Sequence, residues 1–207
     1  MQPGQIVILN GAPRSGKSSI ARALQSRTDT PWINLGVDAS MATLPPHLHP
    51  GIGLRPGGER PDLEPLVATL YAALYESIAA HSRLGLAVVA DLGHHDRYSR
   101  PLGILPDAAR RLTGLPVLFV GVRCPLATIL ARRAAAPVRG LTHYETPTPT
   151  GPPPAVLAWE SVHEPGIYDL QVDTSELTSD ACVDRIIAAL SNGPTVPSVL
   201  GWLVKLH

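Results

Sequence analysis

The sequence predicts an α/β fold of three layers, in which a five-stranded parallel sheet lies between helices. Three observations predict it. An apolar run near the N-terminus leads into a glycine-rich loop and a helix, two later apolar runs are continuous enough to be buried on both faces, and amphipathic helices separate them. With 207 residues, of which 44% are hydrophobic and 16% charged, the chain fits a single globular domain over residues 1–207.

Residues 11–18 read Gly-Ala-Pro-Arg-Ser-Gly-Lys-Ser and match the pattern G-x-x-x-x-G-K-[ST] of a phosphate-binding loop. The required context is present, because a predicted strand at 5–10 precedes the loop and a helix at 16–26 follows it. Lys17 can reach the β- and γ-phosphates, and the Ser18 hydroxyl can bind Mg²⁺. The residues predicted to bind ATP here are Gly11, Ala12, Pro13, Arg14, Ser15, Gly16, Lys17, Ser18 and Ser19.

Residues 31–38 read as a second strand that ends in Asp38. Ligands of a doubly wound sheet bind outside the carboxyl ends of its strands, which would place Asp38 across the crevice from the phosphate loop. There it could accept the proton of a substrate hydroxyl. It could equally cap the short helix that follows, and the spacing leaves both roles open.

The segment 41–62 is rich in proline and glycine and has no hydrophobic periodicity, which predicts a binding loop on the acceptor side of the crevice. His47 and His49 lie in it, but with no third ligand nearby a surface position is the better interpretation than a metal site.

A helix is predicted over 63–84, where Tyr71 and Tyr75 belong to an apolar stripe that favours the core over an acceptor pocket. The run 86–91 predicts a central strand that ends in Asp91, which could hold Mg²⁺ or form a turn. The loop after it leaves open whether its polar residues touch the acceptor or face solvent; these are His94, His95 and Asp96.

A helix at 106–112 and a strand at 115–124 come next, followed by a helix at 125–135. Phosphoryl transfer needs cations on the migrating group, and the region 132–158 is predicted to be a lid that supplies them. Its candidate cations are Arg132, Arg133 and Arg139, and the proline-rich insert 145–154 interrupts it.

The remaining chain predicts a helix at 155–163, a fifth strand within 168–175 and a helix at 179–190 capped by its first serine. Asp173 and Thr174, at the end of that strand, are predicted to meet the adenine of ATP. The apolar tail 193–207 is expected to dock on its own domain or on another subunit, as a contact between copies of the chain.

The charge balance, with 17 basic and 17 acidic residues, favours a small-molecule partner over nucleic acid or a membrane surface. No export signal or spanning segment is visible, so we expect a cytoplasmic protein. Cys124 and Cys182 have no metal or redox spacing and are expected to be buried thiols.

The order of elements is that of a P-loop kinase, which predicts the strand order 2-3-1-4-5 and a lid. With these elements in place, the chain resembles the chloramphenicol phosphotransferase family over most of its length. The segments that carry the resemblance are 8–18, 31–38, 120–124, 162–169 and 172–174, with the blocks Gly-Val-Asp, Gly-Val-Arg-Cys and Val-His-Glu the more discriminating.

The resemblance implies an ATP- and Mg²⁺-dependent kinase that phosphorylates a hydroxyl of a small molecule, and it places Asp38 on the catalytic base of the family. It also implies antibiotic resistance through chloramphenicol or another hydroxylated antibiotic. The acceptor-facing loops at 41–62 and 94–104 match the family poorly, however. A nucleotide or sugar-nucleotide kinase, using Arg55 and Arg60, and a nucleotide-binding regulatory module without turnover are the alternatives.

Overall fold

The computed structural model describes residues 2–48, 61–135, 158–164, 166–192 and 199–203. Its centre is a five-stranded, wholly parallel sheet of order β2-β3-β1-β4-β5, which confirms the predicted fold class and strand order. The strands are β1 Ile6–Asn10, β2 Trp32–Asn34, β3 Ala87–Leu92, β4 Val117–Arg123 and β5 Leu170–Asp173.

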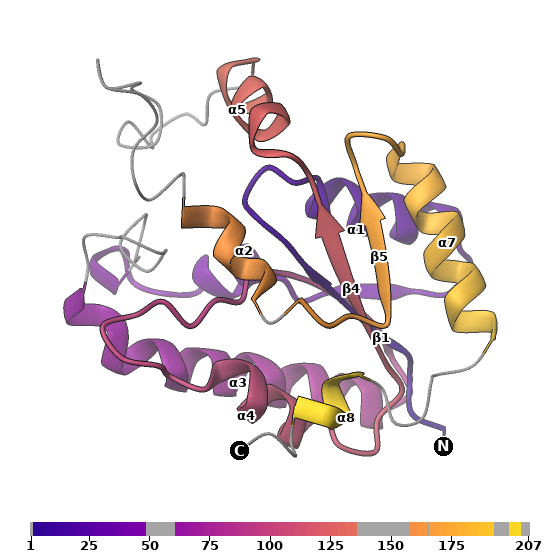
Figure 1. Cartoon of the computed structure of the whole chain (residues 1–207). Helices are drawn as coiled ribbons and strands as arrows, with labels where there is room; N and C mark the ends of the chain where they lie inside the picture. The colour runs from indigo at the N-terminus through magenta and orange to yellow at the C-terminus, as the bar shows by residue number, and fades with distance from the viewer. Residues whose placement is uncertain (1, 49–60, 136–157, 165, 193–198, 204–207) are drawn as a thin grey trace.

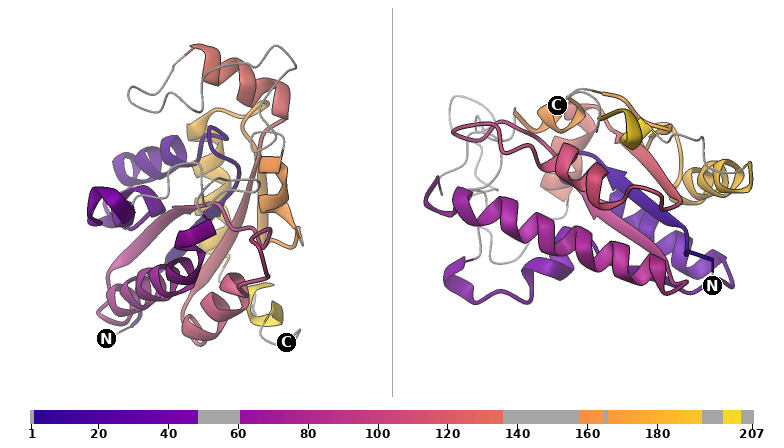
Figure 2. Two further views of the ribbon diagram at one scale, coloured as in Figure 1. Left: turned by 90° about the vertical axis from the view of Figure 1, so that its left-hand side faces the viewer. Right: turned by 90° about the horizontal axis from the view of Figure 1, so that it is seen from below.

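Helices cover both faces of this sheet, as Figures 1 and 2 show. On one face, α3 (Glu64–Arg83), α4 (Ile104–Arg111) and α8 (Val199–Leu203) pack over a core that includes Ile8, Ile78 and Phe119. On the other face, α1 (Lys17–Arg27) and α7 (Ser179–Ser191) pack over Leu9, Leu24 and Val120. These two apolar layers fix the sheet, and the sheet fixes the loops at its carboxyl edge.

The second strand is shorter than predicted. It ends at Asn34, and residues 37–41 form the short helix α2 (Val37–Met41), so Asp38 lies in the first turn of a helix and does not end a strand. The cause is packing: Gly36 passes so close to β3 that a methyl group on it would lie 1.7 Å from Asp91 Oδ1. The chain must leave the sheet before Gly36 to make this approach.

Several other elements also differ from the prediction in their bounds, type or cap. Asp91 lies inside β3, which continues to Leu92. The described part of the predicted helix at 155–163 is the 3₁₀ helix η5 (Ala158–His163). The cap of α7 is Thr178, whose hydroxyl accepts a hydrogen bond from the Ala181 N–H, and not Ser179, because α7 begins at Ser179 itself.

The described part of the C-terminal tail packs on its own domain. Leu200 and Leu203 of α8 are buried in the same core as α4, and the Val199 N–H donates to Asp169 Oδ1 at 2.9 Å. The 3₁₀ helices η1 (Pro46–Leu48) and η3 (Pro61–Leu63) flank residues 49–60 of the predicted acceptor loop. The described residues do not include the proline-rich insert 145–154 or four of the residues named above, which are His49, Arg55, Arg60 and Arg139.

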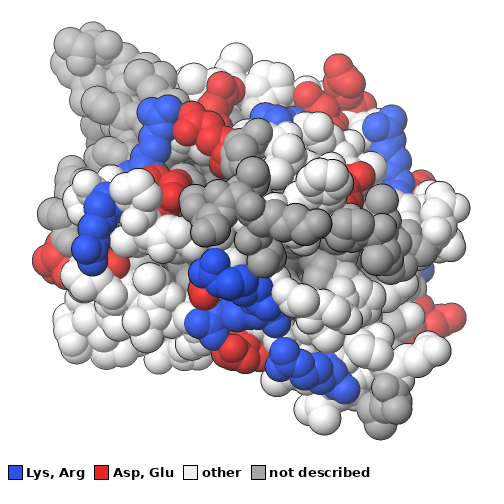
Figure 3. Space-filling view, turned by 60° about the horizontal axis from the view of Figure 1, so that its bottom comes forward, with Lys and Arg blue, Asp and Glu red and all other residues white. Residues whose placement is uncertain are grey.

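Figure 3 shows one face of the molecule, on which basic and acidic side chains lie next to one another. Within the described ranges, no helix is both long and apolar enough to cross a membrane. Both cysteines are buried thiols, as predicted.

Candidate active site

The loop between β1 and α1 has the tight curvature that its sequence predicts. A methyl group on Gly11 would lie 2.4 Å from the Val122 carbonyl oxygen, so only glycine fits there. Gly16 adopts φ 101°, and Arg14 adopts φ 68°, which is uncommon for a residue with a side chain. Ser15 is fully buried, and its Oγ has no hydrogen-bond partner among the described residues. A loop with this curvature turns backbone N–H groups toward one point, as anion binding requires.

Lys17 and Ser18 open helix α1 at the end of this loop. The Lys17 ammonium donates to the carbonyl oxygens of Gly11 and Ala12, at 2.8 and 2.9 Å. The Ser18 hydroxyl donates to Asp91 Oδ2 at 2.6 Å, which joins α1 to β3. The sequence-predicted metal ligands, Ser18 and Asp91, are therefore in direct contact.

Asp91 is 7% exposed and touches a second element beside α1. The close approach of Gly36 to Asp91 Oδ1 brings the N-terminus of α2 to the same carboxylate that Ser18 binds. Asp38 is exposed in the first turn of that helix. The sequence-predicted base thus lies two residues from a glycine that touches the predicted metal ligand.

Arg132, on helix α5 (Leu126–Ala135), holds the phosphate loop against the end of β5. Its guanidinium donates to the Arg14 carbonyl oxygen at 3.2 Å and to the Thr174 carbonyl oxygen at 2.7 Å. Thr174 in turn donates its hydroxyl to the Ser15 carbonyl oxygen at 2.6 Å. The structure therefore brings Arg132 and Thr174 together with the loop.

Two other residues predicted to lie in the site are Arg133 and Asp173. Arg133 lies next to Arg132 on α5 and is half-buried. Asp173 accepts hydrogen bonds from the N–H and hydroxyl of Ser175 through Oδ1, at 2.8 and 2.6 Å, and so shapes the turn after β5.

Sequence reasoning missed a buried polar network behind the loop. Asn10, the last residue of β1, is 1% exposed. Its amide donates to the Val162 carbonyl oxygen at 2.8 Å and to Tyr168 Oη at 2.9 Å, and its Oδ1 accepts from the His94 N–H at 2.7 Å. The signal that could have revealed this network is an amide in an otherwise apolar strand, directly before the loop.

The loop after β3 contains the polar residues whose surroundings the sequence left open. His94 and His95 are buried, and the side chain of Tyr75 hydrogen-bonds His94 Nε2. Burial, with a smaller contribution from His95, lowers the pKa of His94 to about 3, so its imidazole is neutral at pH 7. Asp96 is exposed and accepts from the Leu102 N–H at 2.8 Å, which ties this loop to the start of α4. Tyr75 is a core residue, as its helical spacing predicted.

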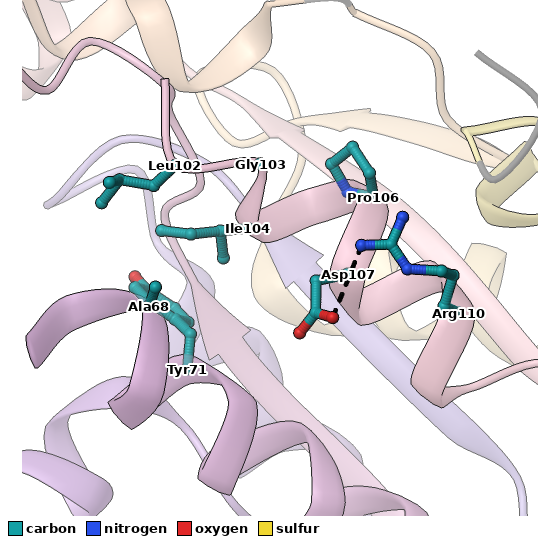
Figure 4. A pocket seen from close by; sticks show the side chains of 8 residues that line it. All are labelled: Ala68, Tyr71, Leu102, Gly103, Ile104, Pro106, Asp107 and Arg110. Carbon is teal, nitrogen blue, oxygen red and sulfur yellow. Dashed lines mark ion pairs between the residues drawn. The ribbon is translucent and has the colours of Figure 1, made fainter. Parts of the chain in front are cut away.

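A cavity of about 270 Å³ lies between α3 and α4 (Figure 4). Tyr71 lines it from α3, and the ion pair of Asp107 with Arg110, at 3.6 Å, lines it from α4. None of its lining residues belongs to the phosphate loop, β3 or α2. We therefore assign it no part in phosphate chemistry.

The donor set fits ATP and Mg²⁺. Mg²⁺ takes oxygen ligands, keeps several waters, and is commonly bound by one or two protein groups plus phosphate oxygens. Ser18 and Asp91 supply two such oxygens, and within the described residues no group of three or more His, Cys, Asp or Glu side chains forms a separate metal site. Lys17 and the curved loop supply the matching phosphate site.

Known proteins share this architecture. Solved structures with the same fold include the APS kinase CysC of Mycobacterium tuberculosis, with a TM-score of 0.59 and 16% identity over 92% of this chain and 99% of that one. The shikimate kinase of Acinetobacter baumannii has a TM-score of 0.58 and 14% identity over 93% and 95%. The tunicamycin resistance protein of Deinococcus radiodurans has a TM-score of 0.57 and 16% identity over 90% and 96%.

Two sequence relatives come from the CDC 1551 and H37Rv strains of Mycobacterium tuberculosis and are named as candidate O-phosphotransferases. Each is 29% identical over 136 residues, which cover 59% of this chain and 58% of the relative. The chain thus matches little more than half the length of these relatives. The family described as chloramphenicol phosphotransferase-like protein matches residues 4–191. The chain belongs to the chloramphenicol phosphotransferase-like family.

Proposed function

We propose that this protein is an ATP- and Mg²⁺-dependent phosphotransferase that moves the γ-phosphate of ATP to a hydroxyl of a small molecule. Membership of the phosphotransferase-like family and a kinase fold support the reaction class. The bond that forms joins the acceptor oxygen to phosphorus. The bond that breaks releases ADP, and the hydroxyl proton leaves to a base.

The observation that carries the proposal is the contact of Ser18 with Asp91 beside Gly36. It joins the phosphate loop, the end of β3 and the start of α2 at one point on the carboxyl edge of the sheet. Bound Mg²⁺ would neutralise developing charge on the phosphates, and Ser18 and Asp91 are the residues that would hold it. Lys17 and the loop would hold the phosphates themselves.

Asp38 is the proposed base. Its position in the first turn of α2 leaves the carboxylate exposed, so a substrate hydroxyl can reach it and transfer a proton. Arg132, Arg133 and Arg139 are the proposed cations for the transferring group. In the structure Arg132 binds Arg14 and Thr174 and so orders the phosphate loop. The proposed adenine contacts are Asp173 and Thr174.

The acceptor class is the open part of the proposal. The family description supports chloramphenicol or another hydroxylated antibiotic. A nucleotide or sugar-nucleotide kinase is the second candidate, since Arg55 and Arg60 stand in the segment that follows α2. The third is a nucleotide-binding module without turnover, which the run Ala134 to Ala136 in place of further lid cations favours.

The test is ADP release from MgATP against a panel of hydroxylated antibiotics, sugars and nucleoside monophosphates. We expect one class to stimulate release, which identifies the acceptor. Tight ATP binding with no stimulation by any class would instead favour the module. In Asp38→Asn, turnover should fall by about a hundredfold or more while ATP affinity stays nearly unchanged, since a general base acts only on the reacting proton. An undiminished turnover number would remove Asp38 from the mechanism.

A further inference from the structure

Asn10 has a fixed amide orientation. Its Oδ1 lies 2.7 Å from the backbone N–H of His94, which can only donate, so this atom is the oxygen and the other is the nitrogen. The nitrogen therefore donates both of its protons, to the Val162 carbonyl oxygen and to Tyr168 Oη. One proton of Asn10 is thus always directed at the tyrosine oxygen.

The hydroxyl proton of Tyr168 must then point to another acceptor. His163 Nδ1 lies 2.8 Å from Oη, and the Val162 carbonyl oxygen lies 3.5 Å away. The longer contact is at the limit of a hydrogen bond, whereas the contact with His163 Nδ1 has the usual length. The Tyr168 hydroxyl therefore donates to His163 Nδ1.

This donation fixes the tautomer of His163. A neutral imidazole carries one proton, and a nitrogen that accepts a hydrogen bond is the one without it, so the proton lies on Nε2. Burial first, and then the charges of Arg123 and Lys17, lower the pKa of His163 to about 4, which keeps the ring neutral at pH 7. Nε2 has no hydrogen-bond partner in the part of the chain that the structure describes.

The tyrosine that holds His163 is itself locked. A methyl group on Gly121 would lie 2.5 Å from the Tyr168 ring, which shows that the ring lies directly on β4. The Phe119 ring lies 4.9 Å from it, centroid to centroid, and the Arg123 guanidinium lies 5.6 Å from its centroid. His163 is therefore held by a side chain with little freedom to move. Its neighbour in the chain, Val162, lies in the same buried cluster as Ala12 of the phosphate loop.

We propose that His163 donates its Nε2–H to an oxygen of the bound reactants, and that Asn10 and Tyr168 are positioning residues that hold the imidazole in this tautomer. The inference rests on the proposed phosphotransferase function. A neutral donor suits a position that the charges of Lys17 and Arg123 already influence, because it binds an electron-rich oxygen without adding a third positive charge. The oxygen belongs either to the phosphoryl group or to the acceptor.

The tautomer is measured directly by ¹⁵N–¹H correlation spectra of the imidazole nitrogens in the full chain. The signals of His163, among eight histidines, are those that vanish in His163→Ala. We expect Nε2 to be protonated and Nδ1 not. In Tyr168→Phe, which keeps the ring and loses only the hydroxyl, we expect a mixture of both tautomers. A wild-type ring protonated on Nδ1 would overturn the inference without reference to activity.

Tyr75→Phe is the matched control. It likewise removes a tyrosine hydroxyl that hydrogen-bonds a histidine, between Tyr75 and His94. The signals of His163 should stay unchanged in it. A shift of the His163 tautomer in this variant would mean that general loosening, and not the Tyr168 hydroxyl, sets the tautomer.

The role of the Nε2–H donor is tested with the compound that stimulates ADP release in the panel proposed above. Gln places an amide N–H near the position of Nε2, whereas Asn places one near Nδ1. We expect His163→Ala and His163→Asn to lose about tenfold in kcat/KM, the scale of one hydrogen bond, and His163→Gln to recover part of it. Equal activity of the Gln and Asn variants would contradict a donor at Nε2.

Two nucleotide affinities identify the oxygen. If it belongs to the phosphoryl group, His163→Ala weakens binding of the Mg²⁺ complex of AMP-PNP and leaves MgADP binding unchanged. If it belongs to the acceptor, both affinities stay unchanged and the KM for the acceptor rises. No change in either affinity or in kcat/KM overturns the inference. The tautomer and the affinities need no turnover, so failure of the proposed function is seen separately, as absence of stimulated ADP release.

Discussion

The two sides of the proposed active site, here called the donor wall and the acceptor wall, are built in different ways. The donor wall, formed by residues 11–18 with Asp91, Arg132 and Thr174, is held by side-chain hydrogen bonds between segments as far as 159 residues apart. The acceptor wall, formed by α2 and the segment 41–62, begins with a short helix that has no buried residue. Much of its length, residues 49–60, lies outside the described structure.

The difference separates what the reaction requires from what the acceptor requires. Phosphate chemistry needs a few groups at fixed positions, and packing on the donor wall provides them. Recognition of the acceptor is proposed to depend on side chains of the segment 41–62, where neither hydrophobic periodicity nor a known motif constrains the sequence. Variants of the donor wall, and of the proposed base Asp38, should therefore affect every acceptor equally, whereas variants of the segment 41–62 should not.

The largest effect is expected for Lys17→Ala in the donor wall. It removes the ammonium proposed to bind the β- and γ-phosphates, so turnover should fall by about a hundredfold or more with any acceptor. Arg27→Ala is the control on the same helix, because it removes an exposed cation whose 2.7 Å ion pair with Asp184 contributes about 0–1 kcal/mol. A Lys17→Ala effect confined to one acceptor would break the division between the walls.

A smaller effect is expected for Asp91→Asn. The variant keeps the shape of the side chain and loses the charge that would help hold Mg²⁺, so the Mg²⁺ concentration for half-maximal activity should rise about tenfold or more. Asp96→Asn is the control, since that carboxylate is exposed and caps loop N–H groups. An unchanged Mg²⁺ requirement in Asp91→Asn would exclude this carboxylate from the metal site.

Gly36→Ala tests the junction of the two walls. The added methyl group would lie 1.7 Å from Asp91 Oδ1, so the free energy of unfolding should fall by about 1–3 kcal/mol and the Mg²⁺ requirement should rise as Asp91 is displaced. Gly114→Ala, at φ 79° with no atom within 4 Å, should lose stability alone. If both variants have the same Mg²⁺ requirement, the junction does not position the carboxylate.

The last prediction concerns His94 and bears on stability as a function of pH, not on activity. Its folded-state pKa of about 3 is below the 6.5 of the unfolded chain, so the unfolded chain binds the proton first. The contribution of neutral His94 to the free energy of unfolding is complete above pH 6.5. It is lost as pH falls toward 3, by at most about 1.4 kcal/mol per pH unit. Denaturant unfolding over this range should show a shallower pH dependence for His94→Leu, and equal slopes would refute the assignment.

The sequence located the phosphate-loop motif between a strand and a helix because the signals for these elements are local. The phosphate loop follows a buried strand and precedes a helix, and the parallel sheet then brings Asp91 beside Ser18. The predicted length of β2 was wrong. Gly36 passes close to Asp91, and this tertiary contact has no local signature in the sequence.

The network of Asn10, Tyr168 and His163 escaped prediction for the same reason. Asn10 and Tyr168 are 158 residues apart, and only the pairing of β4 with β1 and β5 brings them together. The role of Arg132 is a related case. Its place at the end of a helix predicted a phosphate contact, whereas its guanidinium donates to two backbone oxygens, that of Arg14 in the phosphate loop and that of Thr174 after β5.

The central claim is most directly tested by the mass of the acceptor after incubation with MgATP. With the compound that stimulates ADP release, the wild-type protein should add the mass of one phosphoryl group for each ADP formed, and Lys17→Ala should add almost none. ADP formed without any phosphorylated acceptor, or equal phosphorylation by Lys17→Ala, would contradict a phosphotransferase that works through this loop.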